Sequence, residues 1–209
     1  MRNSIEFEVY GKLALFTNPH KCEEHSKATY PVPTYGALIG VCESLYWHPT
    51  IRWVIDEIRI MNRIRTYNMA FCGCDYYSGE QRIYENTYIY EPKYQVRAHF
   101  EWDLSRADMK KDRIEGKHYS IIKRRLNRGG FREPYLGLQE CLAYVEPCVF
   151  GEGEGYYDNT GQITFGIMYH SKKYAARTGN ESQPLWWEPI MQDGIIQYAK
   201  PEQCAINVA

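Results

Sequence analysis

Three side chains in this sequence have the types and positions needed to move a proton near a phosphate group: Tyr46, Lys117 and His118. Histidine suits this work because its unperturbed pKa lies near neutrality. A helix N-terminus disfavours the imidazolium cation, so we expect His118 to be neutral and available as a base. Lys117 would neutralise phosphate oxygens, and the phenol of Tyr46 can donate a hydrogen bond or relay a proton.

Lys117 and His118 lie within the most basic stretch of the chain, residues 110–132, KKDRIEGKHYSIIKRRLNRGGFR. This stretch has nine lysines or arginines and two acids, a formal charge of +7, whereas the whole chain carries −1 and the remainder therefore −8. Positive charge gathered this way predicts a local anion site, and the length of the cluster favours a polyanion. The alternative is a solvated basic face without a ligand.

The same stretch has the pattern of a helix followed by a glycine-rich loop. Ile122 and Leu126 are four residues apart on one side, and Gly129-Gly130 stands where a C-terminal glycine is expected. Lys117 and His118 then lie near the helix N-terminus, where backbone N–H groups favour anions. The residues that we expect to contact a polyanion on this helix and loop are Lys123, Arg124, Arg125, Arg128, Gly129, Gly130 and Arg132.

Strands and a second helix are predicted around this stretch. Alternation predicts strands over residues 4–16, with a bend near Gly11, and over 93–103. Thr34 is expected to cap a helix that ends at Tyr46. A further strand over 51–65, with a bulge near Asp56-Glu57, forms a second basic face or ordinary outer-face charge. The residues of that face are Arg59, Arg63 and Arg65.

The order strand, helix, strand, strand, helix, strand predicts an α+β, ferredoxin-like domain over residues 1–150, closed by a strand at about 140–149. Residues 66–92 exceed a normal connection and hold six tyrosines, which predicts an inserted β-hairpin with its turn at 75–79. After a linker at 151–155, we expect a small antiparallel β subdomain over 151–209. It has a pair of strands within 185–198 and a strand at 162–170, whose inward residues are Ile163, Phe165, Ile167 and Tyr169.

Composition and missing motifs exclude several classes of protein. No GxxxxGK[ST] or GxGxxG segment is present, which argues against nucleotide hydrolysis and dinucleotide binding. No close carboxylate cluster suggests two-metal chemistry, so neither a metal nor another cofactor is expected. Seven cysteines, an odd number, fit a reducing compartment. Without an apolar run of membrane-spanning length or a signal peptide, we expect a cytoplasmic protein with no membrane partner.

RNA is a polyanion that carries its own nucleophile, the 2′-hydroxyl group. A protein can therefore cleave RNA without a metal by arranging an acid or base and a cation around one phosphate. Tyr46, Lys117 and His118 have these properties, although a tyrosine at a helix end is also a common packing residue. In this interpretation the hairpin at 66–92 contacts RNA or a neighbouring subunit and does not complete the core.

Several segments, in order over about residues 1–150, together resemble one family. It is the CRISPR-associated endoribonuclease of subtype I-C, the "d" branch of the fifth Cas family. The segments are Tyr30-Pro31-Val32-Pro33-Thr34, Glu43-Ser44-Leu45-Tyr46-Trp47-His48-Pro49, Asn62-Arg63-Ile64-Arg65, and Lys123-Arg124-Arg125 through Pro134-Tyr135-Leu136-Gly137. The resemblance implies a repeat-associated RNA-binding protein with a ferredoxin-like domain, an inserted hairpin and a small C-terminal sheet.

The resemblance also implies an activity and partners. The family cuts the repeat hairpin of precursor CRISPR RNA without metal, leaving a 2′,3′-cyclic phosphate and a 5′-hydroxyl. It then stays on the 5′ handle of the mature CRISPR RNA and joins the type I-C surveillance complex with its large and backbone subunits. The family's catalytic tyrosine, lysine and histidine fall on Tyr46, Lys117 and His118.

This chain departs from the family pattern in two places. Thr66-Tyr67-Asn68-Met69-Ala70 replaces an Arg-Arg-Asn-type stretch, which puts handle contacts there in doubt, and Tyr35-Gly36-Ala37 is less typical. Two alternative functions remain open. In the first, the chain is a non-catalytic, handle-binding subunit of the same complex. In the second, it is a general RNA-binding protein outside CRISPR systems.

Overall fold

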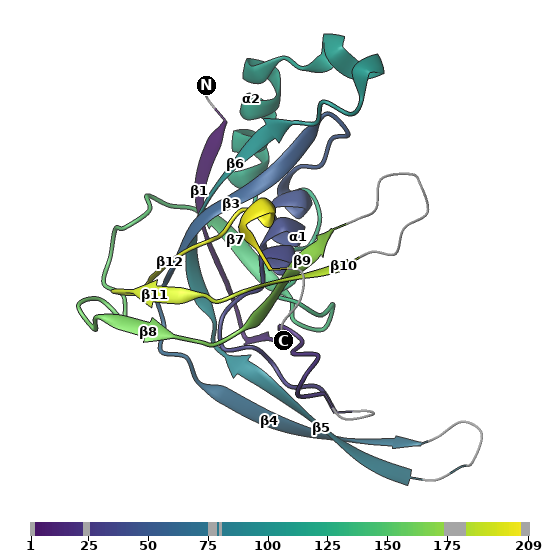
Figure 1. Ribbon diagram of the computed structural model, residues 1–209, viewed down its shortest axis with the longest axis vertical. Coiled ribbons are helices and arrows are strands. Elements are labelled where there is room, and N and C mark those ends of the chain that lie inside the picture. The colour runs from purple at the N-terminus through teal and green to yellow at the C-terminus, as the bar shows by residue number, and fades with distance from the viewer. Residues whose placement is uncertain (1–2, 23–25, 75–78, 80, 174–182, 206–209) are drawn as a thin grey trace.

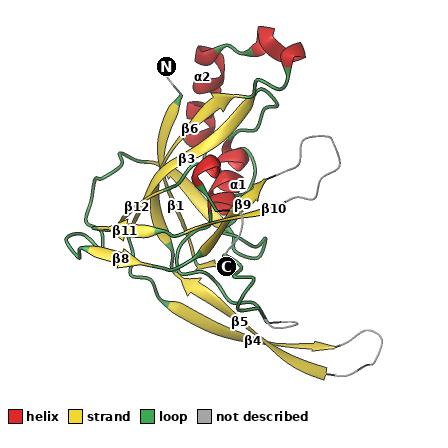
Figure 2. Ribbon diagram, in the orientation of Figure 1, coloured by secondary structure: helices red, strands yellow, loops and turns green. Residues whose placement is uncertain are grey.

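A seven-stranded antiparallel sheet is the centre of the computed structural model, which describes residues 3–22, 26–74, 79, 81–173 and 183–205 (Figure 1). Mixed α/β structure with antiparallel sheets and few helices characterises this part of the chain (Figure 2). The order in the large sheet is β7 (Ala143–Pro147), β1 (Ser4–Gly11), β6 (Lys93–Trp102), β3 (Ile51–Ile60), β12 (Ile195–Gln197), β11 (Ile190–Gln192) and β8 (Gln162–Thr164).

The alternating sequence patterns explain the central strands. Phe7 and Val9 of β1 and Val96 and Phe100 of β6 point to one face and are fully buried. The predicted bend is confirmed, because strand β1 ends at Gly11 and the next strand, β2 (Leu13–Ala14), begins two residues later. The predicted bulge is confirmed as well, by a register shift between Ile55 and Glu57 where β3 pairs with β6.

Two α-helices pack on the buried face of the sheet. In α1 (Tyr35–Leu45) the side chain of Thr34 accepts a hydrogen bond from the Ala37 amide at 3.3 Å, which confirms the predicted cap. In α2 (Glu115–Leu126) the inward residues include Ile122 and Leu126, as predicted. The 3₁₀ helix Ala107–Asp112 precedes α2, and a second one, Pro201–Gln203, follows the last strand.

A long two-stranded arm extends at the end of the molecule opposite to α2 (Figure 1). Its strands, β4 (Thr66–Cys74) and β5 (Gln81–Tyr90), pair antiparallel, and residues 75–78 of the expected turn lie outside the described residues. The prediction that this segment does not complete the core is wrong at its base. Tyr88 and Ile89 are buried in the main core, because β5 also pairs with β2.

The predicted basic strand face is also wrong. β3 ends at Ile60, so that Arg63 and Arg65 lie beyond it in an exposed segment. Arg59 is only 6% exposed, and its Nη2 atom forms an ion pair with Asp158 at 2.6 Å. Its guanidinium also donates to the carbonyl oxygens of Glu152 and Gly153, which lie in the segment expected to be a linker. That segment covers Arg59 and removes it from the surface.

The C-terminal strands continue the central sheet through pairing of β12 with β3. A division of the chain at residue 150 remains a prediction.

Beside this sheet, β9 (Met168–Lys173) pairs with β10 (Gln183–Trp187). Ile163, Phe165 and Tyr169 are partly buried against the core, as predicted. The prediction that Ile167 faces inward is wrong: Ile167 is 53% exposed, whereas Met168 and His170 are fully buried. Gly166, with φ of +72°, breaks the predicted strand and shifts the alternation by one residue.

Candidate active site

Tyr46 and His118 lie in direct contact, although they are 72 positions apart in the sequence. Tyr46 follows the last residue of α1 in an extended conformation, and the indole of Trp53 donates a hydrogen bond to its carbonyl oxygen at 2.8 Å. His118 lies in the first turn of α2. The packing of the two helices brings the Tyr46 hydroxyl to 2.9 Å from Nδ1 of His118.

Both ring nitrogens of His118 are engaged within the protein. Nε2 lies 2.7 Å from the backbone carbonyl of Asp112, which can only accept, so Nε2 carries the proton of the neutral ring. Nδ1 therefore accepts the hydrogen bond from Tyr46. The side chain is fully buried, with the Trp102 ring packed edge-on against it at 5.5 Å.

This burial corrects one prediction. His118 is not directly available as a base to a ligand, because a proton from outside reaches it only through Tyr46. The sequence held a signal for this position: His118 is four residues before Ile122 and eight before Leu126, on the same buried side of α2.

Lys117 stands next to this pair at the surface. Its ammonium group forms an ion pair with Oδ1 of Asp112, the last residue of the 3₁₀ helix. The hydrogen bond from Lys117 holds the pKa of Asp112 below its ordinary value and raises the pKa of Lys117. Both groups are therefore charged at neutral pH, and the cation of the site is already paired with a carboxylate.

His48 completes the cluster and was not among the predicted catalytic residues. Its Nε2 atom lies 3.0 Å from Oδ2 of Asp112, and its Nδ1 atom lies 2.8 Å from the hydroxyl of Thr50. The His48 ring stacks on Tyr46 with an interplanar angle of 13°. Burial lowers the pKa of His48, although Asp112 opposes that shift. The sequence signal for His48 is its spacing from Tyr46, because side chains two residues apart in an extended segment point to the same side.

The proton of Tyr46 is held on the phenol. Burial raises the pKa of Tyr46, and the positive charges of Arg125 and Lys117 only partly oppose this. The Arg125 guanidinium lies over the Tyr46 ring at 4.9 Å and over the Phe131 ring at 4.1 Å. At neutral pH the Tyr46 hydroxyl is therefore protonated and donates to His118.

The predicted polyanion contacts on α2 and the following loop are mostly at the surface. The side chains of Lys123, Arg124, Arg128 and Arg132 are exposed, while that of Arg125 is half-buried against its two aromatic neighbours. In the second predicted group, Arg63 lies over the ring of Tyr156 and Arg65 over that of Tyr90. These stacked arginines keep exposed positions, in contrast to Arg59.

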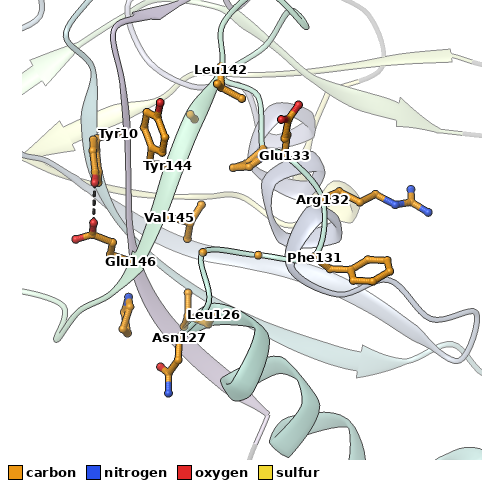
Figure 3. Close-up of a pocket in the computed structure, with 15 residues that line it drawn as sticks. Tyr10, Leu126, Asn127, Phe131, Arg132, Glu133, Leu142, Tyr144, Val145 and Glu146 are labelled. Atoms are coloured by element: carbon orange, nitrogen blue, oxygen red, sulfur yellow. Dashed lines mark hydrogen bonds between the residues drawn. The ribbon is translucent and has the colours of Figure 1, made fainter.

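The glycine-rich loop after α2 borders an open groove of about 560 Å³ along β7 (Figure 3). Gly130 has φ of +114°, and a Cβ atom there would lie 3.1 Å from the Arg132 carbonyl oxygen, so the turn requires glycine. Tyr10 and Tyr144 form the aromatic wall, and Tyr10 donates a hydrogen bond to Glu146 at 2.7 Å. Tyr46, Lys117 and His118 are not part of this groove.

One group of side chains in the described part of the chain has the composition of a metal site. His48, Asp112 and His118 offer ligand atoms within 4.8 Å of one another, and two imidazoles with a carboxylate suit a divalent ion such as Zn²⁺. Nε2 of His48 and Oδ2 of Asp112 lie 3.0 Å apart, so an ion would have to replace that contact.

Comparison with known proteins identifies the family. Residues 4–198 match the Cas5d family, described as CRISPR-associated protein (Cas_Cas5). A relative named CRISPR pre-crRNA endoribonuclease Cas5d from Mannheimia succiniciproducens is 28% identical over 167 residues, covering 69% of this chain and 72% of that protein. The protein of the same name from Thermus thermophilus is 25% identical over 152 residues, covering 68% of this chain and 63% of its own length.

Solved structures agree with this match. A functionally uncharacterized protein from Streptococcus mutans is 29% identical with a TM-score of 0.82, covering 97% of this chain and 95% of that one. A second structure, described as a CRISPR-associated protein, gives 29% identity and a TM-score of 0.81 with the same coverage. The chain belongs to the Cas5d family of CRISPR-associated proteins. In the residues that the structure describes, no helix has the length and apolarity to cross a bilayer.

Proposed function

We propose that this chain is a metal-independent endoribonuclease that cuts precursor CRISPR RNA at its repeat hairpin. The observation that carries the proposal is the hydrogen bond between Tyr46 and the buried His118 beside the exposed cation of Lys117. The relatives named pre-crRNA endoribonucleases support the same substrate.

The geometry supports a relay of the proton. As the RNA 2′-hydroxyl attacks phosphorus, its proton passes to the Tyr46 oxygen while Tyr46 gives its own proton to Nδ1 of His118. The resulting imidazolium keeps its Nε2–H bond to the Asp112 carbonyl. Lys117 stabilises the charge on the phosphate oxygens. The new bond joins the 2′ oxygen to phosphorus, the bond to the 5′ oxygen breaks, and water protonates that oxygen. The products are a 2′,3′-cyclic phosphate and a 5′-hydroxyl.

Exposed cations on α2 and its loop lead away from this site and would hold the RNA backbone. They are Lys123, Arg124, Arg128 and Arg132, with the half-buried Arg125 beside them and Gly129 and Gly130 giving close backbone approach. Arg63 and Arg65 form a second contact near the base of the arm. Arg59 has no part in RNA binding, because its donors are used inside the protein.

The fold supports a finer assignment and a set of partners. The neighbours β7, β1, β6 and β3 with two helices on one face support a ferredoxin-like core, from which β4 and β5 form the inserted arm. Exposed Tyr67, Phe71 and Ile83 on that arm suit contact with another subunit of the type I-C surveillance complex, such as its backbone or large subunit. The six cysteines whose side chains the structure describes are free thiols, in keeping with the reducing cytoplasm.

A non-catalytic subunit that only binds the 5′ handle is the second candidate. The observation that favours it is the occupied site: His118 is buried and Lys117 is paired with Asp112. In that case the cluster would grip the handle without cutting it.

The deciding experiment is incubation of the purified protein with a synthetic repeat RNA in EDTA. We expect cleavage with a cyclic phosphate end, and no cleavage when a single 2′-deoxy nucleotide precedes the scissile phosphate, although binding persists. Cleavage of the 2′-deoxy RNA would refute the mechanism. Loss of cleavage in EDTA, with recovery in Zn²⁺, would instead favour an ion at His48, Asp112 and His118. Tight binding without cleavage in any buffer would support the second candidate.

A further inference from the structure

One residue, Asp112, contacts three of the polar side chains of the candidate site. Its Oδ1 atom accepts from Lys117 and its Oδ2 atom lies 3.0 Å from Nε2 of His48. Its backbone carbonyl accepts from His118 at 2.7 Å. The carboxylate is thus seated between a lysine and a histidine, the arrangement that an incoming phosphate oxygen would need.

A carboxylate and a phosphodiester resemble each other as ligands for such donors. Each carries one negative charge shared between two oxygen atoms that only accept hydrogen bonds. Lys117 cannot neutralise a phosphate in full while its ammonium group is paired with Asp112, and His48 cannot donate from Nε2 to both.

The element that carries Asp112 lies at the surface. The 3₁₀ helix Ala107–Asp112 has no buried residue and is kinked at Met109. Its anchor is Arg113, whose guanidinium donates to the carbonyls of Asp103 and Arg106 at 2.8 Å. A side chain on a segment without buried residues changes its conformation at low cost compared with one in the core.

We propose that the Asp112 carboxylate is an internal substitute for the scissile phosphate and that Lys117 and His48 form the anion subsite beneath it. In the free protein the subsite is self-occupied, and RNA displaces the carboxylate, whose side chain turns away while the backbone carbonyl of Asp112 stays bound to His118. This inference rests on the proposed function for its ligand, an RNA phosphodiester. It adds His48 as a phosphate-binding residue and Asp112 as the competitor that RNA must replace.

Affinity for uncut RNA tests the proposal. A repeat RNA with a 2′-deoxy nucleotide at the cut is titrated into wild type, Asp112→Asn and Asp108→Asn. Asp108→Asn is the matched control, because it removes the same charge from the same 3₁₀ helix at an exposed residue that pairs with Arg106 and not with Lys117 or His48 in the described residues. We expect Asp112→Asn to bind the RNA about two- to fivefold more tightly than Asp108→Asn does, which is the effect usually measured for an exposed ion pair. Equal affinities of the two variants would overturn the proposal.

Inorganic phosphate is the second probe. At constant ionic strength, phosphate should compete with RNA at lower concentration in Asp112→Asn than in wild type, because the subsite is open. Adding Lys117→Gln or His48→Gln to Asp112→Asn should remove that difference. A phosphate effect that survives both additions would mean that the anion binds elsewhere, against the proposal.

Single-turnover cleavage separates this proposal from a direct role of Asp112. A rate at saturating RNA that falls at least tenfold in Asp112→Asn would show that the carboxylate takes part in the chemistry, and would overturn it. The asparagine keeps the backbone carbonyl that His118 contacts, and thermal unfolding checks that the variant folds, with Asp112→Ala as a second version. If no variant cleaves RNA, the proposed activity fails, but the two binding assays still decide on the subsite.

Discussion

The hydroxyl of Tyr46 and Nδ1 of His118, 2.9 Å apart, form a hydrogen bond that is closed to solvent on the histidine side. Neither group can be replaced without changing the other. Removal of the hydroxyl leaves Nδ1 without its donor, and removal of the imidazole leaves a buried phenol without an acceptor. The two residues are therefore expected to act as one catalytic unit.

Tyr46→Phe and His118→Ala should each slow cleavage by about 10² to 10⁴, the usual worth of a positioned acid or base. Because the residues act as a unit, the double variant should be about as slow as the slower single variant. Single-turnover rates with saturating repeat RNA measure this. Tyr10→Phe, which removes a hydroxyl from the groove along β7, is the control. Rates that multiply in the double variant would contradict a shared proton path.

RNA binding should weaken steeply with salt. With about five phosphate contacts from the exposed cations of α2 and its loop, the slope of log affinity against log salt should be roughly −3 to −4. Arg128→Gln should make that slope less steep by about 0.7, the coefficient for one single-strand contact. Arg106→Gln removes an exposed charge outside this surface and should leave the slope unchanged. Fluorescence anisotropy with uncleavable RNA gives both values, and a flat salt response would argue against backbone contacts.

Arg59 is expected to stabilise the fold and not to bind RNA. Arg59→Met would remove the cation that pairs with Asp158 and one donor to each of the carbonyl oxygens of residues 152–153. Among the described residues, Asp158 would keep only the Gly155 amide as a donor, and the carbonyl of Glu152 would keep the Gln95 side chain. We expect a loss of about 3 kcal/mol in the free energy of unfolding, the low end for one partner of a buried ion pair, since Asp158 is partly exposed. Arg63→Met at the surface should change the free energy of unfolding by less than about 0.5 kcal/mol. Urea unfolding compares the two, and an equal effect would mean that the buried pair contributes little.

Stability should fall in mild acid through His170. Burial lowers the pKa of this histidine to about 4, and its Nε2 atom lies 2.9 Å from the Ala199 carbonyl. The unfolded chain, in which histidine has a pKa near 6.5, binds the proton more readily. The contribution is therefore complete above about pH 6.5 and is lost as the pH falls toward 4, by up to about 3 kcal/mol.

The matched variant for this test is His170→Asn, whose amide can still donate to the carbonyl but does not titrate. The unfolding free energies of the two proteins should converge between pH 7 and pH 4, because only the wild type loses the contribution of His170. Titrating carboxylates contribute equally to both proteins and cancel in the comparison. Parallel curves would show that His170 is not responsible.

The predictable parts of this fold are those set by neighbours in the sequence. The Thr34 cap needs only the amide of Ala37, and the burial of Phe7, Val9, Val96 and Phe100 follows from alternation within one strand. The contact of Tyr46 with His118 was expected only through the family resemblance, since the positions are 72 residues apart.

The errors at Arg59, Ile167 and His118 have different causes. Arg59 reads as a surface arginine, and its partner Asp158 lies 99 positions away in a loop with no pattern of its own. The error at Ile167 has a local cause, since Gly166 resets the alternation of the strand. The burial of His118 was visible in its spacing from Ile122, but its position among basic residues favoured a surface interpretation.

Pairing of β12 with β3 has a consequence for synthesis on the ribosome. Glu57 pairs with Gln197, so β3 has no partner on one side until the ribosome has made residues 195–197. During that interval its backbone N–H and C=O groups form an open edge next to Ile55 and Ile58, which are otherwise buried. Nascent chains stalled before residue 195 are therefore the species most prone to aggregate, and they are the ones that a chaperone would need to cover.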